Sequence, residues 1–115
     1  MEPTELAVNR ADRTLTVTFD TGAVYTFTAE FLRVNSPSAE VQGHSPEQKQ
    51  TVAGKKTVGI RDLEAVGHYA VKIIFDDGHD TGLYTWETLA DYGQRQESLW
   101  ATYLAELAVK GLKRE

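Results

Sequence analysis

Apolar residues and threonines alternate along residues 14–19 of the chain. This period of two is typical of a β-strand that buries one face. The Asp-Thr-Gly sequence at 20–22 supplies turn residues, so residues 24–27 are predicted to return as the second strand of a hairpin. Thr28 can then cap a short helix, with Glu30 in the first turn, where the helix dipole favours a carboxylate.

A second unit with the same order of elements is predicted over residues 58–93. One strand ends at Phe75, Gly78 lies in the turn that follows, and a return strand leads to Thr85. Thr85 can cap a helix that Gly93 ends.

The two units align with each other. FDTGAVYTFTAEFL at residues 19–32 matches FDDGHDTGLYTWETL at residues 75–89 with one residue inserted. This is a weak internal repeat of a strand–turn–strand–helix unit. Its simplest cause is architectural, because both segments connect a hairpin to a helix.

Residues 95–113 are predicted to form a C-terminal amphipathic helix, since apolar residues recur there at three- and four-residue spacing. Its apolar stripe needs a partner, and we expect the domain's own sheet to provide it, with a subunit interface as the alternative. The fold class is therefore a small α+β single domain spanning residues 1–115, with antiparallel strands from two hairpin-helix units plus this helix. The predicted core consists of Leu15, Val17, Phe19, Tyr25, Phe27, Leu32, Ile60, Val71, Ile73, Phe75, Tyr84, Trp86, Leu89, Leu99, Trp100, Tyr103 and Leu107.

Composition and charge restrict the classes of function. The chain has no cysteine, which excludes a disulfide framework and any thiolate metal site. Its net charge of -5 argues against a nucleic-acid binder. The first residues lack the features of a signal peptide, and no apolar run approaches the ~20 residues that cross a bilayer. We expect a soluble, cytoplasmic protein with neither nucleic acid nor membrane as a partner.

A long polar loop over residues 35–57 separates the two units. Loops of this length in small domains are often functional or disordered. Ser36 followed by Pro37 has the pattern of a helix N-cap with proline at the first helical position, and Gly43 would end the resulting helical turn.

Candidate ligands for a metal ion lie at the tip of the second hairpin. His79 stands there among Asp76, Asp77 and Asp80, and these four side chains could hold a divalent ion. Aspartate and glycine are also ordinary turn formers, so a plain turn is the alternative. The sequence contains no recognisable nucleophile–base motif and no glycine-rich phosphate loop, so no catalytic residue is predicted and we do not expect an enzyme.

Two of these segments together resemble a known family. LRVNSPSAEVQGH at residues 32–44 and FDDGHDTGLYTWETLADYG at residues 75–93 are similar to the gamma-butyrobetaine hydroxylase-like N-terminal domain family. In that family the module occurs alone in bacteria, precedes the oxygenase domain of carnitine-biosynthesis hydroxylases, and is attached to P-loop iron–sulfur carrier ATPases of the Mrp type. The resemblance implies no catalytic residues, because those of the hydroxylases lie in their separate domain.

The hydroxylases carry a structural zinc in this module, held by three cysteines and a histidine. The resemblance places Ser36, Ser38 and Val41 at the cysteine positions and His79 at the histidine position. A neutral hydroxyl is a poor substitute for a thiolate, so the zinc site of the relatives is lost. Either the fold persists without metal, or His44 joins His79 in a weaker nitrogen and oxygen site.

Two hypotheses for function follow. In the first, the protein is a non-catalytic accessory module, a monomer or weak homodimer, that binds a protein partner, and the resemblance suggests a P-loop iron–sulfur carrier. The contact residues would be Arg33, Asn35, Ser36, Ser38 and His44.

In the alternative, the protein binds iron or zinc through His79, His44, Asp77 and Asp80. No other cofactor is predicted. A small-molecule site near Tyr84 and Trp86 ranks last, because aromatic residues in such segments usually belong to the core.

Overall fold

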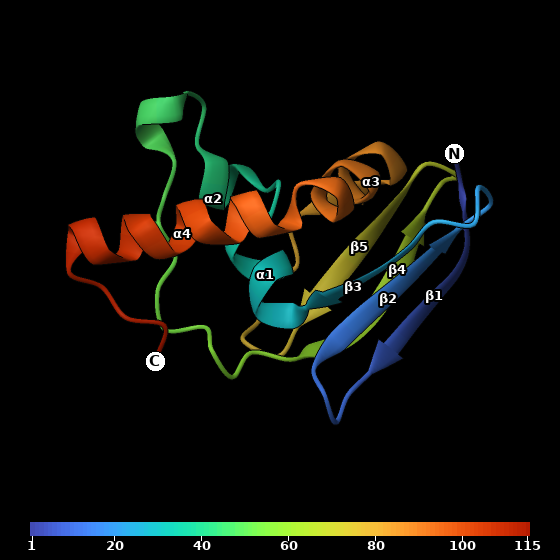
Figure 1. The fold of residues 1–115 in the computed structure, drawn as a ribbon, viewed down its shortest axis with the longest axis horizontal. Coiled ribbons are helices and arrows are strands. Elements are labelled where there is room, and N and C mark those ends of the chain that lie inside the picture. Colours follow the sequence, from blue (N-terminus) through green and yellow to red (C-terminus); the bar gives the residue numbers. More distant parts are fainter.

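Two three-stranded antiparallel sheets form the centre of the molecule (Figure 1). The structure, a computed structural model, describes residues 1–115. The first sheet has the order β1-β2-β3 and the second the order β4-β5-β6. The strands are β1 (Pro3–Asn9), β2 (Thr14–Phe19), β3 (Val24–Thr28), β4 (Ile60–Val66), β5 (Ala70–Phe75) and β6 (Leu83–Thr85). The fold is α+β, as predicted.

In Figure 1 the helices lie above and to the left of the strands, with α3 near the upper end of β5 and α1 at the left-hand end of β3. They are α1 (Ala29–Val34), α2 (Ala39–Gln42), the 3₁₀ turn η1 (Pro46–Gln48), α3 (Trp86–Gln94) and α4 (Gln96–Lys110). None of them is long and apolar enough to cross a lipid bilayer.

The internal repeat is an architectural one. The hairpin turns at Gly22 and Gly78 have nearly the same backbone, with φ of 90° and 92°, which only glycine adopts without strain. The amide of each glycine donates to the carbonyl of the phenylalanine three residues earlier, over 3.0 and 3.1 Å. Thr28 and Thr85 then cap α1 and α3 through their hydroxyls, as predicted.

Both sheets bury their alternating face in one core of 15 residues, which confirms most of the predicted core. Tyr25, Trp86, Leu99 and Trp100 are only partly buried and pack against its edge. The prediction omitted several buried residues, three of them in α1, where burial on nearly all sides leaves no periodicity to detect. They are Ala29, Phe31, Val34, Val41, Val58, Ala70 and Ala90.

The C-terminal helix docks differently from the prediction. Only its first half, with Leu99 and Trp100, reaches the edge of the main core. Its second half forms a separate small cluster in which Tyr103 and Leu107 pack against Val34 of α1, with residues 52–53 of the long loop at the edge. The loop, and not the sheet, therefore covers much of the helix.

Two predicted helix boundaries are wrong. Ser38, and not Ser36, caps α2 by accepting a hydrogen bond from the amide of Glu40 over 3.1 Å. Gly93 does not end its helix, because α3 continues through Gln94. Gly93 is instead a packing position: a Cβ atom there would lie 2.3 Å from Cγ of Tyr25.

We therefore predict that Gly93→Ala destabilises the protein by about 1–3 kcal/mol, because the Tyr25 ring must move. Helix propensity alone would make the same change stabilising by up to about 1 kcal/mol. Urea unfolding measures the difference, with Gln94→Ala, at an exposed position of the same helix, as the control. A more stable Gly93→Ala protein would contradict the packing role.

Candidate functional site

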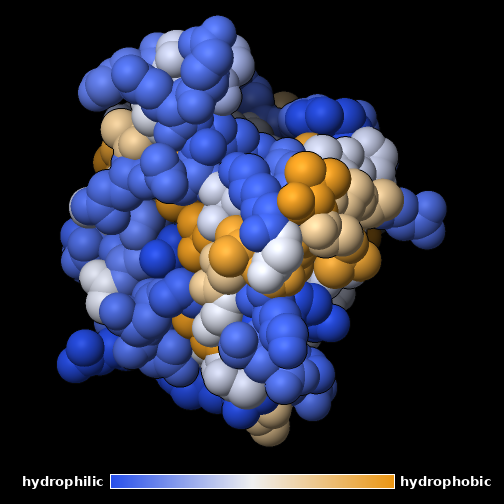
Figure 2. All heavy atoms as spheres, turned by 90° about the vertical axis from the view of Figure 1, so that its left-hand side faces the viewer, coloured by the Kyte–Doolittle hydropathy of each residue, from blue (hydrophilic) through white to orange (hydrophobic).

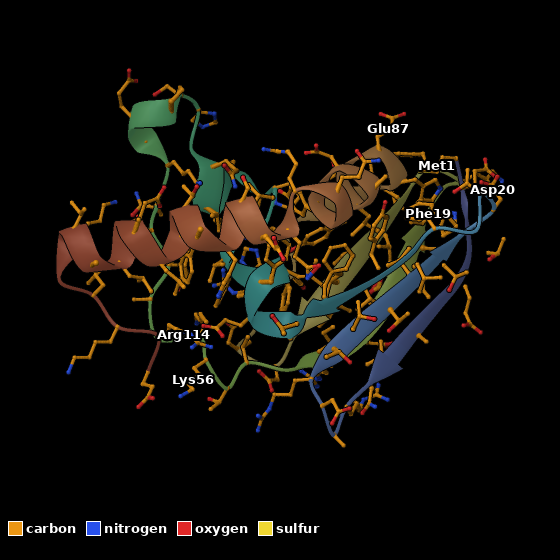
Figure 3. All side chains as sticks on the ribbon, in the orientation of Figure 1. Met1, Phe19, Asp20, Lys56, Glu87 and Arg114 are labelled. Atoms are coloured by element: carbon orange, nitrogen blue, oxygen red, sulfur yellow. The ribbon has the colours of Figure 1, made fainter.

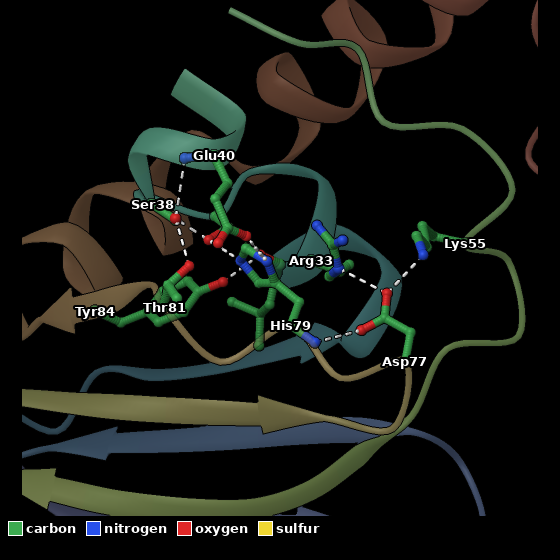
Figure 4. Close-up of polar contacts among 10 residues, drawn as sticks. Arg33, Ser38, Glu40, Lys55, Asp77, His79, Thr81 and Tyr84 are labelled. Carbon is green, nitrogen blue, oxygen red and sulfur yellow. Dashed lines mark hydrogen bonds and ion pairs between the residues drawn. The ribbon is translucent and has the colours of Figure 1, made fainter. Parts of the chain in front are cut away.

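The long loop meets the turn between β5 and β6 in a cluster of polar side chains (Figure 4). The loop supplies residues 36–40 as it passes from α1 into α2, and the turn supplies residues 77–81. The αL-like backbone of Gly78 reverses the chain directly before His79, which places the imidazole under the loop. We call this cluster the loop–hairpin site.

A chain of three side chains occupies its centre. Oγ of Ser36 lies 2.8 Å from Nε2 of His79, and Nδ1 of His79 lies 3.2 Å from Oε2 of Glu40. The amide of Ser38 donates to the same Ser36 oxygen over 3.3 Å. These contacts are mutually consistent for a neutral imidazole that donates from Nδ1 to the carboxylate and accepts at Nε2 from the serine hydroxyl.

Burial keeps this imidazole neutral. The His79 side chain is only 3% exposed. Its removal from water, together with the positive charge of Arg33, lowers the pKa of His79, although the Glu40 and Asp77 carboxylates oppose the shift.

Serine, histidine and glutamate in this order also occur in hydrolases as nucleophile, base and orienting carboxylate. Sequence reasoning missed the arrangement because Ser36 and His79 are 43 residues apart. Here, however, Ser36 is completely buried. Gly82 packs so closely on it that a Cβ atom there would lie 2.4 Å from its Oγ. A substrate carbonyl cannot reach this hydroxyl, so the arrangement serves to hold the loop on the hairpin.

A second pair of hydroxyls joins the same segments. Oγ of Ser38 lies 2.6 Å from Oγ1 of Thr81, while it also accepts the capping bond from α2. The side-chain amide of Gln42 returns to donate to the Ser36 carbonyl over 2.8 Å. The polar groups of the loop are thus bonded within the domain, as buried polar groups require.

Asp77 is the charged centre at the other side of the site. It accepts from Nε of Arg33 over 2.8 Å and contacts Nζ of Lys55 at 2.6 Å. Burial alone would raise its pKa, but the bonds from Lys55, the His79 amide and Arg33 outweigh burial and hold the pKa of Asp77 at about 2. One buried atom of Arg33, Nη1, has no hydrogen-bond partner.

Two tyrosine hydroxyls hold the C-terminal end of α1 in place. The hydroxyl of Tyr84 donates to the Leu32 carbonyl, and that of Tyr92 donates to the Asn35 carbonyl over 2.6 Å. Burial raises the pKa of both hydroxyls, so both remain donors at any physiological pH. Because Tyr84 is completely buried, it cannot line the small-molecule site that ranked last among the predictions.

The predicted metal ligands are not brought together. His44 is exposed, and its backbone amide donates to Gln48 within its own loop. Asp77 is engaged by two cations, and Asp80 lies 3.9 Å from Lys72. No three side chains of histidine, aspartate or glutamate are grouped as a metal ion requires.

The donor set does not fit the zinc that the family resemblance implies either. Ser36 and Ser38 are hydroxyls already engaged by His79 and Thr81, and Val41 is an apolar residue that is 2% exposed. Zinc in such a site requires deprotonated sulfur or free imidazole nitrogen. Hydrogen bonds take the place of the metal in this chain.

The predicted partner-binding residues are mostly internal. Asn35, Ser36 and Ser38 are 7%, 0% and 5% exposed, and the Arg33 side chain is 12% exposed. Only His44 faces solvent. The side chains of the four other residues hold the loop in place and do not form an accessible contact surface. Sequence reasoning missed Lys55, Glu40 and Thr81 as members of the site. These residues belong to no motif, and the sequence alone does not show which side chains they contact.

Comparisons with known proteins give a consistent result. The family model described as "Gamma-butyrobetaine hydroxylase-like, N-terminal" matches residues 6–90. An NMR solution structure of a protein 47% identical superposes with a TM-score of 0.85 and covers 99% of this chain and 90% of that chain. A second NMR structure, also 47% identical, gives a TM-score of 0.86 over 99% of this chain and 85% of that chain.

A crystal structure from Acidithiobacillus ferrooxidans ATCC 23270 is also similar. It is described as a protein of unknown function of the DUF971 family, is 38% identical, and gives a TM-score of 0.65 over 76% of this chain and 88% of that chain. The search of curated proteins gave no match.

We predict that Asp77→Asn lowers the free energy of unfolding at pH 7 by about 1–2 kcal/mol, after allowance for solvent screening at a side chain that is 18% exposed. Because the folded pKa lies below the ordinary value, this stabilisation is present above about pH 4 and is lost as the pH falls toward 2. The wild type should therefore lose its advantage over the variant in acid. Asp80→Asn, at a half-exposed carboxylate, is the control and should change stability by less than about 1 kcal/mol.

A separate prediction concerns zinc. Zinc that binds the native state would raise the melting temperature. Because Ser36, Ser38 and Val41 supply no thiolate, a few-fold excess of Zn²⁺ should leave the melting temperature of the wild type unchanged. The variant Ser36→Cys/Ser38→Cys/Val41→Cys restores thiols beside His79 and should gain a zinc-dependent increase. A zinc-dependent increase in the wild type would show that its hydroxyl and imidazole groups do form a metal site.

Proposed function

The chain belongs to the gamma-butyrobetaine hydroxylase-like N-terminal family, and on that premise we propose that it is a non-catalytic accessory module that binds a protein partner. In keeping with this, the serine–histidine pair of the loop–hairpin site is sealed from solvent, because Ser36 is 0% exposed. The loop–hairpin site then has a structural role, and binding must use another surface.

The observation that carries the proposal is an apolar groove at the C-terminal end of α4. The groove has a volume of about 530 Å³, and Leu104, Leu107, Ala108 and Leu112 line it. Leu104 and Leu112 are 39% and 40% exposed, which is unusual for neighbouring leucines on a surface otherwise rich in charge. Figure 2 shows apolar residues gathered on this face of the molecule within hydrophilic surroundings.

The rim of the groove carries three cations, Lys56, Lys113 and Arg114, and the carboxylate of Glu115. Lys56 pairs with Glu115 and Arg114 pairs with Glu30, which leaves Lys113 without an ion pair. An apolar centre with a charged rim is the usual anatomy of a protein contact. The unpaired Lys113 would favour a partner with an acidic group at the edge of the contact.

The family resemblance suggests the partner, a P-loop iron–sulfur carrier of the Mrp type. A second copy of this chain is the alternative occupant of the groove, in keeping with the predicted monomer or weak homodimer. The cytoplasmic location predicted from the sequence remains part of the proposal, as does the absence of enzymatic activity.

Isothermal titration calorimetry, in which the purified carrier from the same cell is titrated into this protein, tests the proposal. The double variant Leu104→Glu/Leu112→Glu should weaken binding at least about tenfold, because two carboxylates cannot be buried in an apolar contact. Val109→Glu is the matched control, since Val109 is 86% exposed on the same helix but does not line the groove.

Equal weakening by the control variant would reject the groove as the contact surface. Absence of any heat with the wild type would reject the carrier as the partner. Sedimentation of the wild type and the double variant then decides whether a second copy occupies the groove instead.

A further inference from the structure

A separate pocket lies between α1 and the first half of α4. It has a volume of about 430 Å³, and its lining includes two carboxylates, Glu30 and Glu97, two aromatic rings, Phe31 and Trp100, and the side chain of Arg114. Acidic groups beside an aromatic face form the usual environment for an organic cation. The chain already places one such cation there.

Glu30 is a fixed anion at the bottom of this pocket. Its side chain is only 6% exposed, and it belongs to the first turn of α1, next to the Thr28 cap. The helix dipole favours a carboxylate at that position, but a buried charge still requires a counter-ion. If the counter-ion leaves, Glu30 cannot follow it into water, because its backbone lies in a helix packed into the core.

Arg114 supplies the counter-ion from a more exposed position. Its Nε and Nη2 donate to the two oxygens of Glu30 over 2.9 and 2.7 Å, and its guanidinium carbon lies 5.2 Å from the centre of the Trp100 ring. Its side chain is 38% exposed. Residues 112–115 form no helix or strand, and backbone bonds from Gly54 and Lys56 hold the segment against the loop (Figure 3).

The pair is therefore asymmetric: the Glu30 side chain is buried, while the Arg114 side chain is 38% exposed. Only another cation can replace Arg114 at this site, since an empty site leaves the buried Glu30 carboxylate uncompensated. Glu97, an exposed residue, adds a second carboxylate to the pocket. Arg114 thus neutralises only one of the two anions.

We propose that this pocket binds the guanidinium of an arginine side chain from a partner protein, which replaces Arg114 on Glu30 and stacks on Trp100. Guanidinium fits better than ammonium because both oxygens of Glu30 are already presented to a bidentate donor, and a planar cation can lie on the indole ring. Arg114 acts as the intramolecular occupant and weakens binding of the external group.

This inference depends on the proposed function only for the source of the ligand, a partner protein. The pocket shares only Arg114 with the lining of the apolar groove, and a small guanidinium compound tests it without any partner. Failure of the carrier to bind therefore leaves the pocket intact, and failure of the pocket leaves the groove intact.

Chemical rescue of Arg114→Ala in the full chain is the decisive experiment. The variant should melt at a lower temperature than the wild type, and Nα-acetyl-arginine amide at about 10 mM should recover at least half of the loss, because the ligand binds only the native state. Nα-acetyl-citrulline amide, a neutral molecule of nearly the same shape, should not. Trp100 fluorescence in a Trp86→Phe background reports binding directly, and the variant should bind at least about tenfold more tightly than the wild type.

Two further variants keep the test specific. Glu30→Gln/Arg114→Ala removes the buried charge and should show no response, whereas Glu97→Gln/Arg114→Ala should bind a few-fold more weakly than Arg114→Ala. If Arg114→Ala is unfolded alone, refolding by the arginine compound and not by the citrulline compound gives the same support. No recovery, or equal recovery with the citrulline compound or with sodium chloride, would overturn the proposal.

Discussion

The contact between the buried imidazole of His79 and the 36–40 segment is the interaction on which the rest of the molecule's arrangement depends. A connection of more than twenty residues would otherwise pay a large entropic cost for any single position. His79 ties the start of the loop to the second sheet through Ser36 and Glu40. Once the start is fixed, the rest of the loop can lie along α4 and supply Val52 and Ala53 to the helix.

Local signals made much of the fold predictable. The alternation in β2, the threonine caps of α1 and α3 and the glycine turns each depend on residues within a few positions of one another. Gly93 shows where such signals fail. A glycine near the end of a helical pattern predicts the end of the helix from local sequence alone. In the structure Gly93 instead leaves room for the ring of Tyr25, which lies in another element. The predicted docking of α4 on the sheet failed for the same reason. Amphipathicity shows that one face of a helix is covered, but it does not identify the segment that covers it.

The candidate site was predictable only in part. The family resemblance placed Ser36 and His79 in one site, and the structure brings them into contact. The sequence could not show that their hydrogen bonds would be satisfied internally, because Glu40, Thr81 and Lys55 carry no motif of their own. For the same reason the sequence could not show that Arg33 and Asn35 are largely buried: polarity in a sequence does not distinguish a residue that faces a partner from one that braces a loop.

The hydrophobic core is divided unequally, and this bears on cooperativity. The large cluster joins both sheets, whereas the cluster of Val34, Tyr103 and Leu107 contains only three buried residues. Amide hydrogens in the loop, the distal half of α4 and residues 112–115 should then exchange with solvent by a shared partial opening that leaves the sheets intact. Both surfaces proposed for binding border this less stable region, so a ligand there would act on the opening equilibrium as well as on its contacts.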